Sequence, residues 1–372
     1  MKVLVIGGGM AGLSATLSLR TAGIDVDVIE RDPAWGVYGV GIIQPANALR
    51  ALDVLGLAEA CVDAGQAIRG DRTFLADGVT QIAAHDWPTL VDGLPPGNGI
   101  TRPKLHEILK AATNRSGANV RTGVTAAEIE DVGDQVEVAC SDGSEGTYDL
   151  VIGADGLYSQ TRARIFGEDL KPEFTGQVCW RYNLPRIQGL EEIRVYIGPH
   201  GTLGFVPIGR DLMYAFLIET PMADQAVAIE REGAAAIMRR RLEPFAGPIV
   251  ELRDEIADDD AVVLRPIEAI LVPSPWYRGR IVLLGDAVHG TSPHAGQGAA
   301  QALDDGIVLA QELGRGAPLA QALEAFTNRR FERCRTVVEG SLAISRWEQD
   351  HSLPIDPDAT RAQIGMSAAM PI

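Results

Sequence analysis

The chain has 372 residues, 46% hydrophobic and 22% charged, a composition typical of a globular protein with one large or two coupled domains. Its 33 basic and 50 acidic residues give a net charge of −17. The sequence shows no cluster of basic residues of the kind that nucleic-acid-binding proteins usually have. No apolar run has the length of a membrane helix, and the short N-terminal apolar run lacks a signal-peptide cleavage pattern, so we expect a cytoplasmic protein. The cysteines show no CxxC pair and the histidines no HExxH pattern, so we predict no disulfide framework and no metal site.

A strand, a helix and a second strand are predicted at the start of the chain. Residues 2–7 form an apolar, β-branched run typical of a buried parallel strand. A helix is expected over 10–22, ending at Gly23, and a second strand over 24–30. The three elements make a βαβ unit.

The loop between this first strand and the helix, Gly7 to Gly12, fits the GxGxxG pattern. Its position inside a βαβ unit is the context that predicts a dinucleotide pyrophosphate site at the helix N-terminus. Glu30 ends the second strand, where an acid suits a ribose hydroxyl and would repel a 2′-phosphate. The contacts predicted from this unit are Gly7, Gly9, Ala11, Gly12, Glu30 and Arg31. The loop alone does not distinguish FAD from NAD.

The middle of the chain alternates between helical and strand-like patterns. Helices are predicted over 45–55 and 102–112, separated by a Gly-, Pro- and Asp-rich excursion over 71–100. Three short strands are expected within 118–152. Residues 174–270 then predict antiparallel strands, interrupted by a helix-like stretch over 225–242.

The last third returns to a strand over 279–287, followed by a glycine-rich loop and two helices that reach Trp347, and a polar tail from His351 that we expect to be loose. The predicted fold class is therefore α/β, a Rossmann-like domain with a second α+β domain built on an antiparallel sheet. The predicted boundaries are 1–75, 97–170 and 278–350 for the first domain, 76–96 and 171–277 for the second, and 351–372 for the tail.

Two further motifs select the cofactor. They are YDLVIGADGLYSQTR (148–162) and GRIVLLGDAVHGTSPHAGQG (279–298). With the glycine loop and in this order, they resemble the single-component FAD-dependent aromatic hydroxylases, the family of p-hydroxybenzoate hydroxylase and salicylate hydroxylase. The resemblance covers most of the chain, although 171–270 matches in layout only.

The resemblance assigns roles to residues of these motifs. It implies that Asp286 binds the ribityl chain of FAD, that Asp155 shapes the flavin cleft and supports reaction with NAD(P)H, and that Arg102 contacts FAD unless it is a surface arginine. Gly296, Gln297 and Gly298 would open a helix that faces the flavin's pyrimidine edge. His289 is expected to make a structural hydrogen bond. The sequence departs from the family's frequent Glu-Asp-Ala at Asp304-Asp305-Gly306, where a glycine inside a helix costs about 1 kcal/mol.

The chemistry that the resemblance implies is hydroxylation of a small aromatic or heteroaromatic substrate. NAD(P)H would reduce FAD, and O2 would give a C4a-hydroperoxyflavin whose distal oxygen attacks the ring. An epoxidase or an oxidase on the same scaffold stays open, as does a non-catalytic binding protein of related fold. The expected partners are the substrate, O2 and NAD(P)H, with no nucleic acid and no membrane, in a monomer or homodimer.

The substrate pocket is expected between the flavin and the antiparallel sheet. The candidates are Arg181, Tyr182, Phe205, Tyr214 and Phe216. Each aromatic could equally be sheet core, and Arg181 could bind a substrate carboxylate or form an ion pair at the sheet edge. Pro293 and His294 are the catalytic candidates, because their loop should approach the flavin ring.

Overall fold

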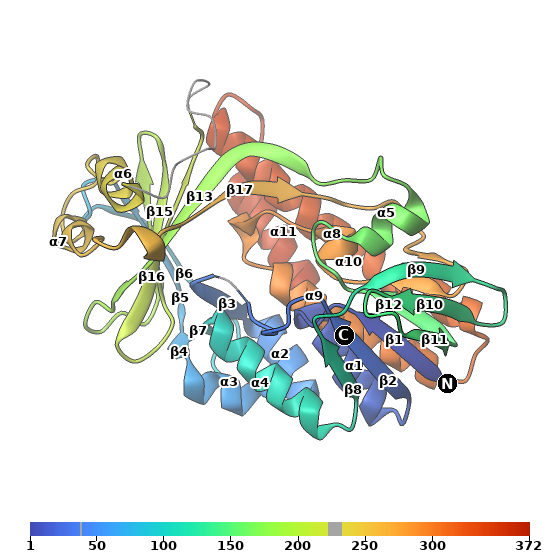
Figure 1. The fold of residues 1–372 in the computed structure, drawn as a ribbon. Helices are drawn as coiled ribbons and strands as arrows, with labels where there is room; N and C mark the ends of the chain where they lie inside the picture. The colour runs from blue at the N-terminus through green and yellow to red at the C-terminus, as the bar shows by residue number, and fades with distance from the viewer. Residues whose placement is uncertain (38, 222–232) are drawn as a thin grey trace.

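The computed structural model describes residues 1–37, 39–221 and 233–372. It has two parts, one built on a mostly parallel sheet and the other on a mostly antiparallel sheet (Figure 1). The fold class predicted from the sequence is confirmed. The predicted helix over 225–242 lies partly outside the described residues, and α6 (Ala234–Arg241) is the described part of it.

The first part is a three-layer structure around a six-stranded sheet. The strands in spatial order are β18 (Tyr277–Arg278), β19 (Ile281–Leu283), β12 (Leu150–Gly153), β1 (Lys2–Ile6), β2 (Asp25–Glu30) and β8 (Asn119–Thr122), all parallel except β18. Alternate residues of β1 point to opposite faces, so the apolar run predicted here is buried on both.

Helices cover one face of this sheet and a small antiparallel sheet covers the other. The helices of this part are α1 (Met10–Thr21), α2 (Ala46–Val54), α3 (Ala58–Ala64), α4 (Arg102–Arg115), α5 (Gln160–Phe166), α8 (Asp286–His289), α9 (Gly298–Gly314) and α10 (Leu319–Gln349). The small sheet consists of β9 (Ala126–Asp131), β10 (Val136–Cys140) and β11 (Glu145–Tyr148). Residues 118–152 therefore hold five strands in two sheets, where the sequence predicted three.

The second part is a seven-stranded sheet. Its strands in spatial order are β17 (Val263–Ala269), β13 (Glu173–Pro185), β16 (Leu212–Glu219), β15 (Gly201–Pro207), β14 (Ile193–Gly198), β5 (Gly70–Leu75) and β6 (Gln81–Asp86). The short helices α6 and α7 (Ile249–Asp254) pack on one face of it. β5 pairs with β14 and so belongs to the sheet of the second part. The predicted first domain ends after residue 75, and it therefore includes this one strand of the second part.

A second small sheet joins the two parts. It contains β3 (Gly41–Pro45), β7 (Gly97–Thr101) and β4 (Gln66–Ile68). A Cβ at Gly41 would lie 2.3 Å from the Tyr214 ring, and one at Gly99 would lie 1.9 Å from the Pro207 carbonyl oxygen. The two glycines therefore allow this sheet to touch the large one.

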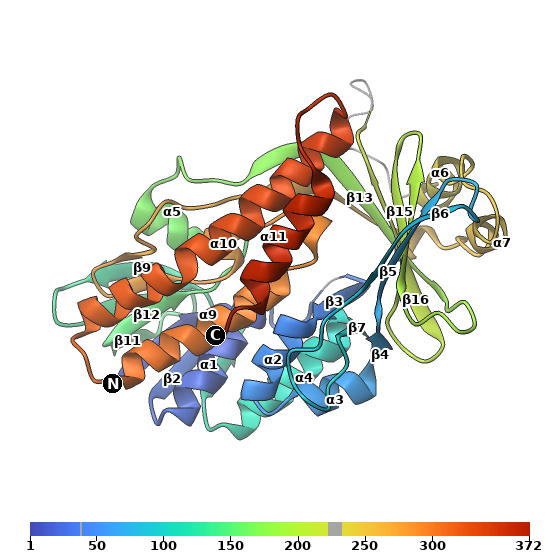
Figure 2. The ribbon, with the colours of Figure 1, turned by 180° about the vertical axis from the view of Figure 1, so that it is seen from behind.

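The C-terminal tail is ordered, so the expectation of a loose end was wrong. It forms α11 (Pro357–Ala369), whose first turn is capped by the Asp356 carboxylate. Figure 2 shows α11 lying along α10, and Arg50 of α2 donates hydrogen bonds to the Ala368 and Ala369 carbonyls. None of the described helices combines the length and apolarity that a membrane crossing requires.

Candidate functional site

The glycine loop after β1 has the geometry of a phosphate cradle. Gly7 has a φ of +111°, and a Cβ there would lie 2.3 Å from the Ala154 carbonyl oxygen. A Cβ at Gly12 would lie 2.0 Å from the Gly7 carbonyl oxygen, so this glycine permits close packing of α1. A Cβ at Gly9 meets nothing within 4 Å. The backbone of Gly9 is thus open to a ligand at the N-terminus of α1.

Side chains from distant segments hold this loop. Glu30 accepts hydrogen bonds from the backbone N–H groups of Gly8 (2.7 Å) and Asp32 (2.8 Å). Trp35 Nε1 donates to the Gly8 carbonyl (3.0 Å), and His106 Nε2 lies 2.8 Å from the same oxygen. Burial lowers the pKa of His106, which favours a neutral ring with its proton on Nε2. No sequence motif marks Trp35 or His106, because both are far from the loop along the chain.

Arg31 lies exposed directly after Glu30, and Ala11 is buried in the first turn of α1. Asp155 is more constrained. Its carboxylate accepts hydrogen bonds from the Ser159 hydroxyl and from the backbone N–H and hydroxyl of Thr161 at the start of α5. Asp155 therefore orders the end of β12 beside the glycine loop, and its role toward NAD(P)H stays a prediction.

Asp286 and Arg102 lie together where the two parts of the molecule meet. Asp286 is the first residue of α8, and Arg102 is the first residue of α4. Solvent reaches both side chains, but many protein atoms lie around each of them. These surroundings raise the pKa of Asp286, against the opposing charges of His289 and Arg102. Desolvation, followed by the charge of Arg181, lowers the pKa of Arg102.

The loop before α9 completes this opening. Gly296 has a φ of +63°, and a Cβ there would meet nothing within 4 Å. Gln297 is buried, and its Oε1 accepts a hydrogen bond of 2.8 Å from Asn47. Gly298 is the first residue of α9, a helix of 17 residues. The open glycines and the accessible Asp286 leave room for FAD. That Gly9 holds the pyrophosphate, Asp286 the ribityl chain and the start of α9 faces the ring stays a prediction.

Comparison with known proteins decides the family. Residues 1–341 match the family model described as FAD binding domain. The chain belongs to the FAD-dependent monooxygenases of the aromatic-hydroxylase family. FAD is its cofactor and NAD(P)H its reductant, as the sequence predicted.

Relatives and solved structures agree with this family over nearly the whole chain. The aurachin C monooxygenase/isomerase of Stigmatella aurantiaca is 32% identical, over 94% of this chain and 90% of its own. The 2-heptyl-3-hydroxy-4(1H)-quinolone synthase of Pseudomonas aeruginosa (strain UCBPP-PA14) is 31% identical, over 95% and 92%. The structure of Klebsiella pneumoniae HpxO with FAD and uric acid is 25% identical with a TM-score of 0.86, over 99% and 96%.

The face that the large sheet turns toward the FAD-binding part carries three of the five pocket candidates. Arg181 pairs with Phe216 across β13 and β16, and Tyr214 is two residues from Phe216, so all three share one face. A Cβ at Gly41 of β3 would lie 2.3 Å from the Tyr214 ring, so this face is turned toward the small sheet whose strand β7 runs into Arg102. The role of these three residues in the substrate pocket stays a prediction.

Tyr182 and Phe205 lie on the opposite face. Phe205 is 1% exposed and packs against Tyr196 in the core under α6 and α7. The Tyr182 hydroxyl accepts a hydrogen bond from the Asp258 backbone in the same layer. Placing them in the pocket was wrong, because a one-residue shift along a strand moves a side chain to the other side of the sheet.

His294 is held in place by polar contacts within the loop that is predicted to approach the flavin. Its Nδ1 lies 2.9 Å from the Ser292 hydroxyl, and its Nε2 lies 3.3 Å from Glu348 Oε2 on α10, without the angle of a hydrogen bond. The side chain is 1% exposed. This geometry favours a positioning role, and a catalytic role for His294 stays a prediction. Pro293 beside it, in the 3-10 turn Pro293–Ala295, is exposed.

A buried charge network supports the turn that carries Asp286. Asp305 Oδ2 accepts from the Gly285 backbone (2.8 Å) and lies 2.6 Å from His289 Nε2, while Oδ1 accepts from Arg330 (2.7 Å). Burial opposes the charge of Asp305, but His289 and Arg330 lower its pKa to about 2. The structural hydrogen bond predicted for His289 is confirmed.

The same network includes a set of atoms that resembles a metal site. The ligand atoms of His289, Asp305 and Cys334 lie within 4.8 Å of one another. Arg330 donates to Asp305 and lies 3.4 Å from the Cys334 sulfur, so a guanidinium already fills the space. The cluster is therefore explained as an ion-pair network.

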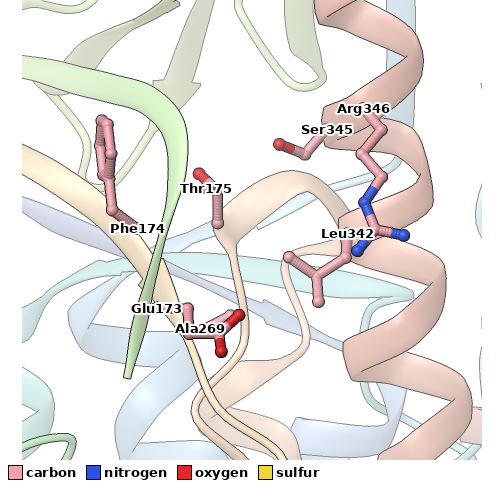
Figure 3. A pocket seen from close by; sticks show the side chains of 7 residues that line it. All are labelled: Glu173, Phe174, Thr175, Ala269, Leu342, Ser345 and Arg346. Atoms are coloured by element: carbon pink, nitrogen blue, oxygen red, sulfur yellow. The ribbon is translucent and has the colours of Figure 1, made fainter. Parts of the chain in front are cut away.

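A small hollow of about 150 Å³ opens elsewhere, between β13, β17 and α10. Figure 3 shows Leu342, Ser345 and Arg346 reaching from α10 toward Phe174 and Thr175 of β13. Pockets that hold a small organic ligand are typically about 300 Å³ or larger. The hollow contains neither Arg181 nor Asp286, so it lies apart from the predicted substrate pocket.

Proposed function

We propose that this enzyme uses NAD(P)H and O2 to hydroxylate a small aromatic or heteroaromatic substrate. The proposal rests on the seam, the boundary at which the FAD-binding part and the large sheet face each other. Asp286, Arg102 and the open loop at Gly296 lie on the FAD-binding side. Arg181 and Phe216 face them from the large sheet. A ring held between these surfaces would lie next to the flavin.

The chain's own residues would bind the cofactor, orient the substrate ring and shield it from water. Gly9 and Asp286 would hold the cofactor, and the N-terminus of α9 would stabilise negative charge on its ring. Bound and reduced FAD supplies the activated oxygen that the protein itself cannot make. Phe216 and Tyr214 would pack against the substrate ring and keep water away from it. No side chain is required as a covalent nucleophile.

The named relatives favour a heteroaromatic substrate over a simple phenol. One relative is named for a quinolone product, and the HpxO structure holds uric acid. Both molecules are nitrogen heterocycles that carry oxygen substituents on the ring. Epoxidation has weaker support, because this chain covers only about half the length of the zeaxanthin epoxidases that it matches. The cytoplasmic location and the monomeric or dimeric state stay predictions.

The test begins with purified protein and its visible spectrum. The proposal expects bound FAD, and a panel of phenols, hydroxybenzoates, pyridines, purines and quinolones is then screened for stimulated NAD(P)H oxidation. Hydroxylated product should form in step with the NAD(P)H consumed. Stimulated oxidation that yields only H2O2 would indicate an oxidase, and colourless protein without FAD would overturn the proposal altogether.

A further inference from the structure

Arg330 of α10 lies at the centre of a buried hydrogen-bond network that reaches both turns expected at the flavin. Its side chain is 1% exposed, and its Nε donates to Asp305 Oδ1 (2.7 Å). Its Nη2 donates to the side-chain oxygen of Gln301 (2.7 Å) and to the Gln301 backbone carbonyl (3.1 Å). One guanidinium from α10 therefore binds two residues that lie four positions apart, on one side of α9.

Asp305 connects this guanidinium to the turn that carries Asp286. Its other carboxylate oxygen, Oδ2, accepts a hydrogen bond of 2.8 Å from the Gly285 backbone N–H. Gly285 has a φ of +61°, and a Cβ there would lie 2.7 Å from the Ala11 Cβ, so the turn packs closely on α1. Because Asp305 holds the residue directly before Asp286, it fixes the point at which α8 and the Asp286 side chain begin.

Gln301 connects the same guanidinium to the turn at the start of α9. Its backbone N–H donates to the Gln297 carbonyl (3.0 Å), and its Nε2 lies 3.5 Å from Gln297 Oε1. The same Gln297 oxygen accepts a hydrogen bond of 2.8 Å from Asn47 of α2. Gln297 lies between Gly296 and Gly298, which have no side chains, so its own side chain anchors this turn to the network.

Stability alone does not account for a buried arginine at this place. Replacing a buried ion pair with apolar residues of similar volume is often neutral or stabilising. The two helices also have another polar link, because Arg329 donates to Glu312 and Gln311 near the other end of α9. An apolar side chain at position 330 could pack between the helices, but it would lack donors in a fixed geometry toward two acceptors.

We infer that Arg330 is a positioning residue for FAD, because it holds the Asp286 turn and the Gly296–Gly298 turn at the spacing that the cofactor requires. Its donors bind Asp305 and Gln301, so it acts through these residues and need not touch the flavin. The inference rests on the part of the proposed function that places FAD at these two turns, and it does not depend on the substrate.

The experiment replaces Arg330 and follows amide hydrogen exchange in the FAD-loaded protein, with FAD affinity measured by titration of apoprotein. Arg330→Met removes the donors, so exchange should become faster in residues 285–289 and in residues 296–301 together. FAD affinity should fall about 3- to 10-fold, the loss expected for one misplaced hydrogen bond. Arg330→Lys keeps the charge without the fork and should recover part of this affinity.

Gln301→Met is a narrower change that removes the side-chain link toward Gln297 and keeps the pair of Arg330 with Asp305. Exchange should become faster in residues 296–301 and stay at the wild-type rate in residues 285–289. If Arg330→Met does not fold, this variant and Arg330→Lys still decide. Wild-type exchange in both turns of these two variants, with wild-type FAD affinity, would then overturn the inference.

The matched control is Arg329→Gln, which removes the neighbouring arginine that also joins α10 to α9. It should leave FAD affinity and the exchange of both turns unchanged. The inference is overturned if Arg330→Met alters neither turn or only one, or if Arg329→Gln has the same effect, since Arg330 would then only dock the two helices. The wild type serves as the reference for the cofactor itself. If FAD does not slow exchange in these turns of the wild type, the placement of FAD fails, and the proposed function and the inference fail with it.

Discussion

At the scale of single residues, Asp286 offers the most direct test of where FAD lies. Its carboxylate is accessible at the seam and is predicted to accept hydrogen bonds from the ribityl hydroxyls. Asp286→Ala should weaken FAD binding about 10- to 100-fold, because a hydrogen bond to a charged group is worth about 1.5–3 kcal/mol. The dissociation constant is measured by titrating apoprotein with FAD. Asp286→Asn keeps an acceptor and should lose less, and wild-type affinity in the alanine variant would contradict this placement.

Asp305 should matter for stability and for its pH dependence. Its pKa is about 2 in the folded protein against an ordinary 3.8, so folding favours the charged form. The stabilisation is therefore complete above about pH 4 and is lost as the pH falls toward 2. Asp305→Asn should lower the free energy of unfolding at neutral pH by about 3–5 kcal/mol, because Arg330 and His289 lose a buried partner. Urea unfolding should show the deficit shrinking as the pH approaches 2.

The control for Asp305 is an aspartate whose partner is at the surface. Asp358 pairs with Arg361 within exposed α11 side chains, and such pairs contribute at most about 1 kcal/mol. Asp358→Asn should therefore change stability little at any pH. An equal loss of unfolding free energy in both variants would show that the buried network contributes no more to stability than a surface ion pair.

Residues of the recurring motifs could be predicted from the sequence, and residues that meet them through tertiary contacts could not. Gly9 and Gly12 follow from local backbone needs that a short pattern expresses. Trp35 and His106 both bind the Gly8 carbonyl, but they reach it from segments 27 and 98 residues away. The sequence contains no periodicity or spacing that would bring them together.

At the scale of elements, Gly306 shows why a local rule failed to describe α9. A glycine inside a helix costs about 1 kcal/mol relative to alanine. The structure gives the reason for it: a Cβ at Gly306 would lie 2.3 Å from the Ala15 backbone nitrogen of α1. Gly306→Ala should therefore lower the free energy of unfolding by about 1–3 kcal/mol despite its better helix propensity. Urea unfolding of the purified variant measures this change.

Gly314 in the last turn of the same helix is the matched control. A Cβ there would meet nothing within 4 Å. Gly314→Ala should be neutral or stabilise the protein by up to about 1 kcal/mol. If Gly306→Ala also stabilised the protein, close packing of α9 on α1 would not be the reason for the glycine.

The strands illustrate the same limit. The presence of strands in 174–270 was predictable from alternation, but the face toward the flavin was not. Tyr182 and Tyr214 each have apolar residues two positions away on both sides, and the packing of α6 and α7 against one face of the sheet separates them. A two-residue period defines two faces without saying which covers the site.

At the scale of the whole molecule, the order of the two parts was predictable and their connections were not. The three flavin motifs lie in the FAD-binding part, and the interrupted antiparallel run supplied the second sheet. The end of α10 joins the two through polar contacts that leave no pattern in the sequence. Ser345 donates to Gln177 of β13 (2.6 Å), and Gln177 in turn donates to Glu348 (3.2 Å). The register of β13 against β17 shifts between Phe174 and Val178, at the same place.

Glu348 therefore touches β13 and, through His294, the loop before α9. Burial alone would raise the pKa of Glu348, but His294 and Gln177 lower it below the ordinary 4.5. Its stabilisation is thus present above about pH 4.5 and is lost as the pH falls through the lowered value. Glu348→Gln should lower the free energy of unfolding at neutral pH by about 1–2 kcal/mol, with the difference narrowing in acid.

Hydrogen exchange separates a connecting role from a local one. If Glu348 links the two parts, Glu348→Gln should speed amide exchange both in residues 175–177 of β13 and in residues 292–296. Glu339→Gln changes an exposed glutamate of the same helix and should leave both segments unchanged. Faster exchange confined to α10 would show that Glu348 stabilises only its own helix, and the coupling between the flavin loop and the sheet would have to run through other residues.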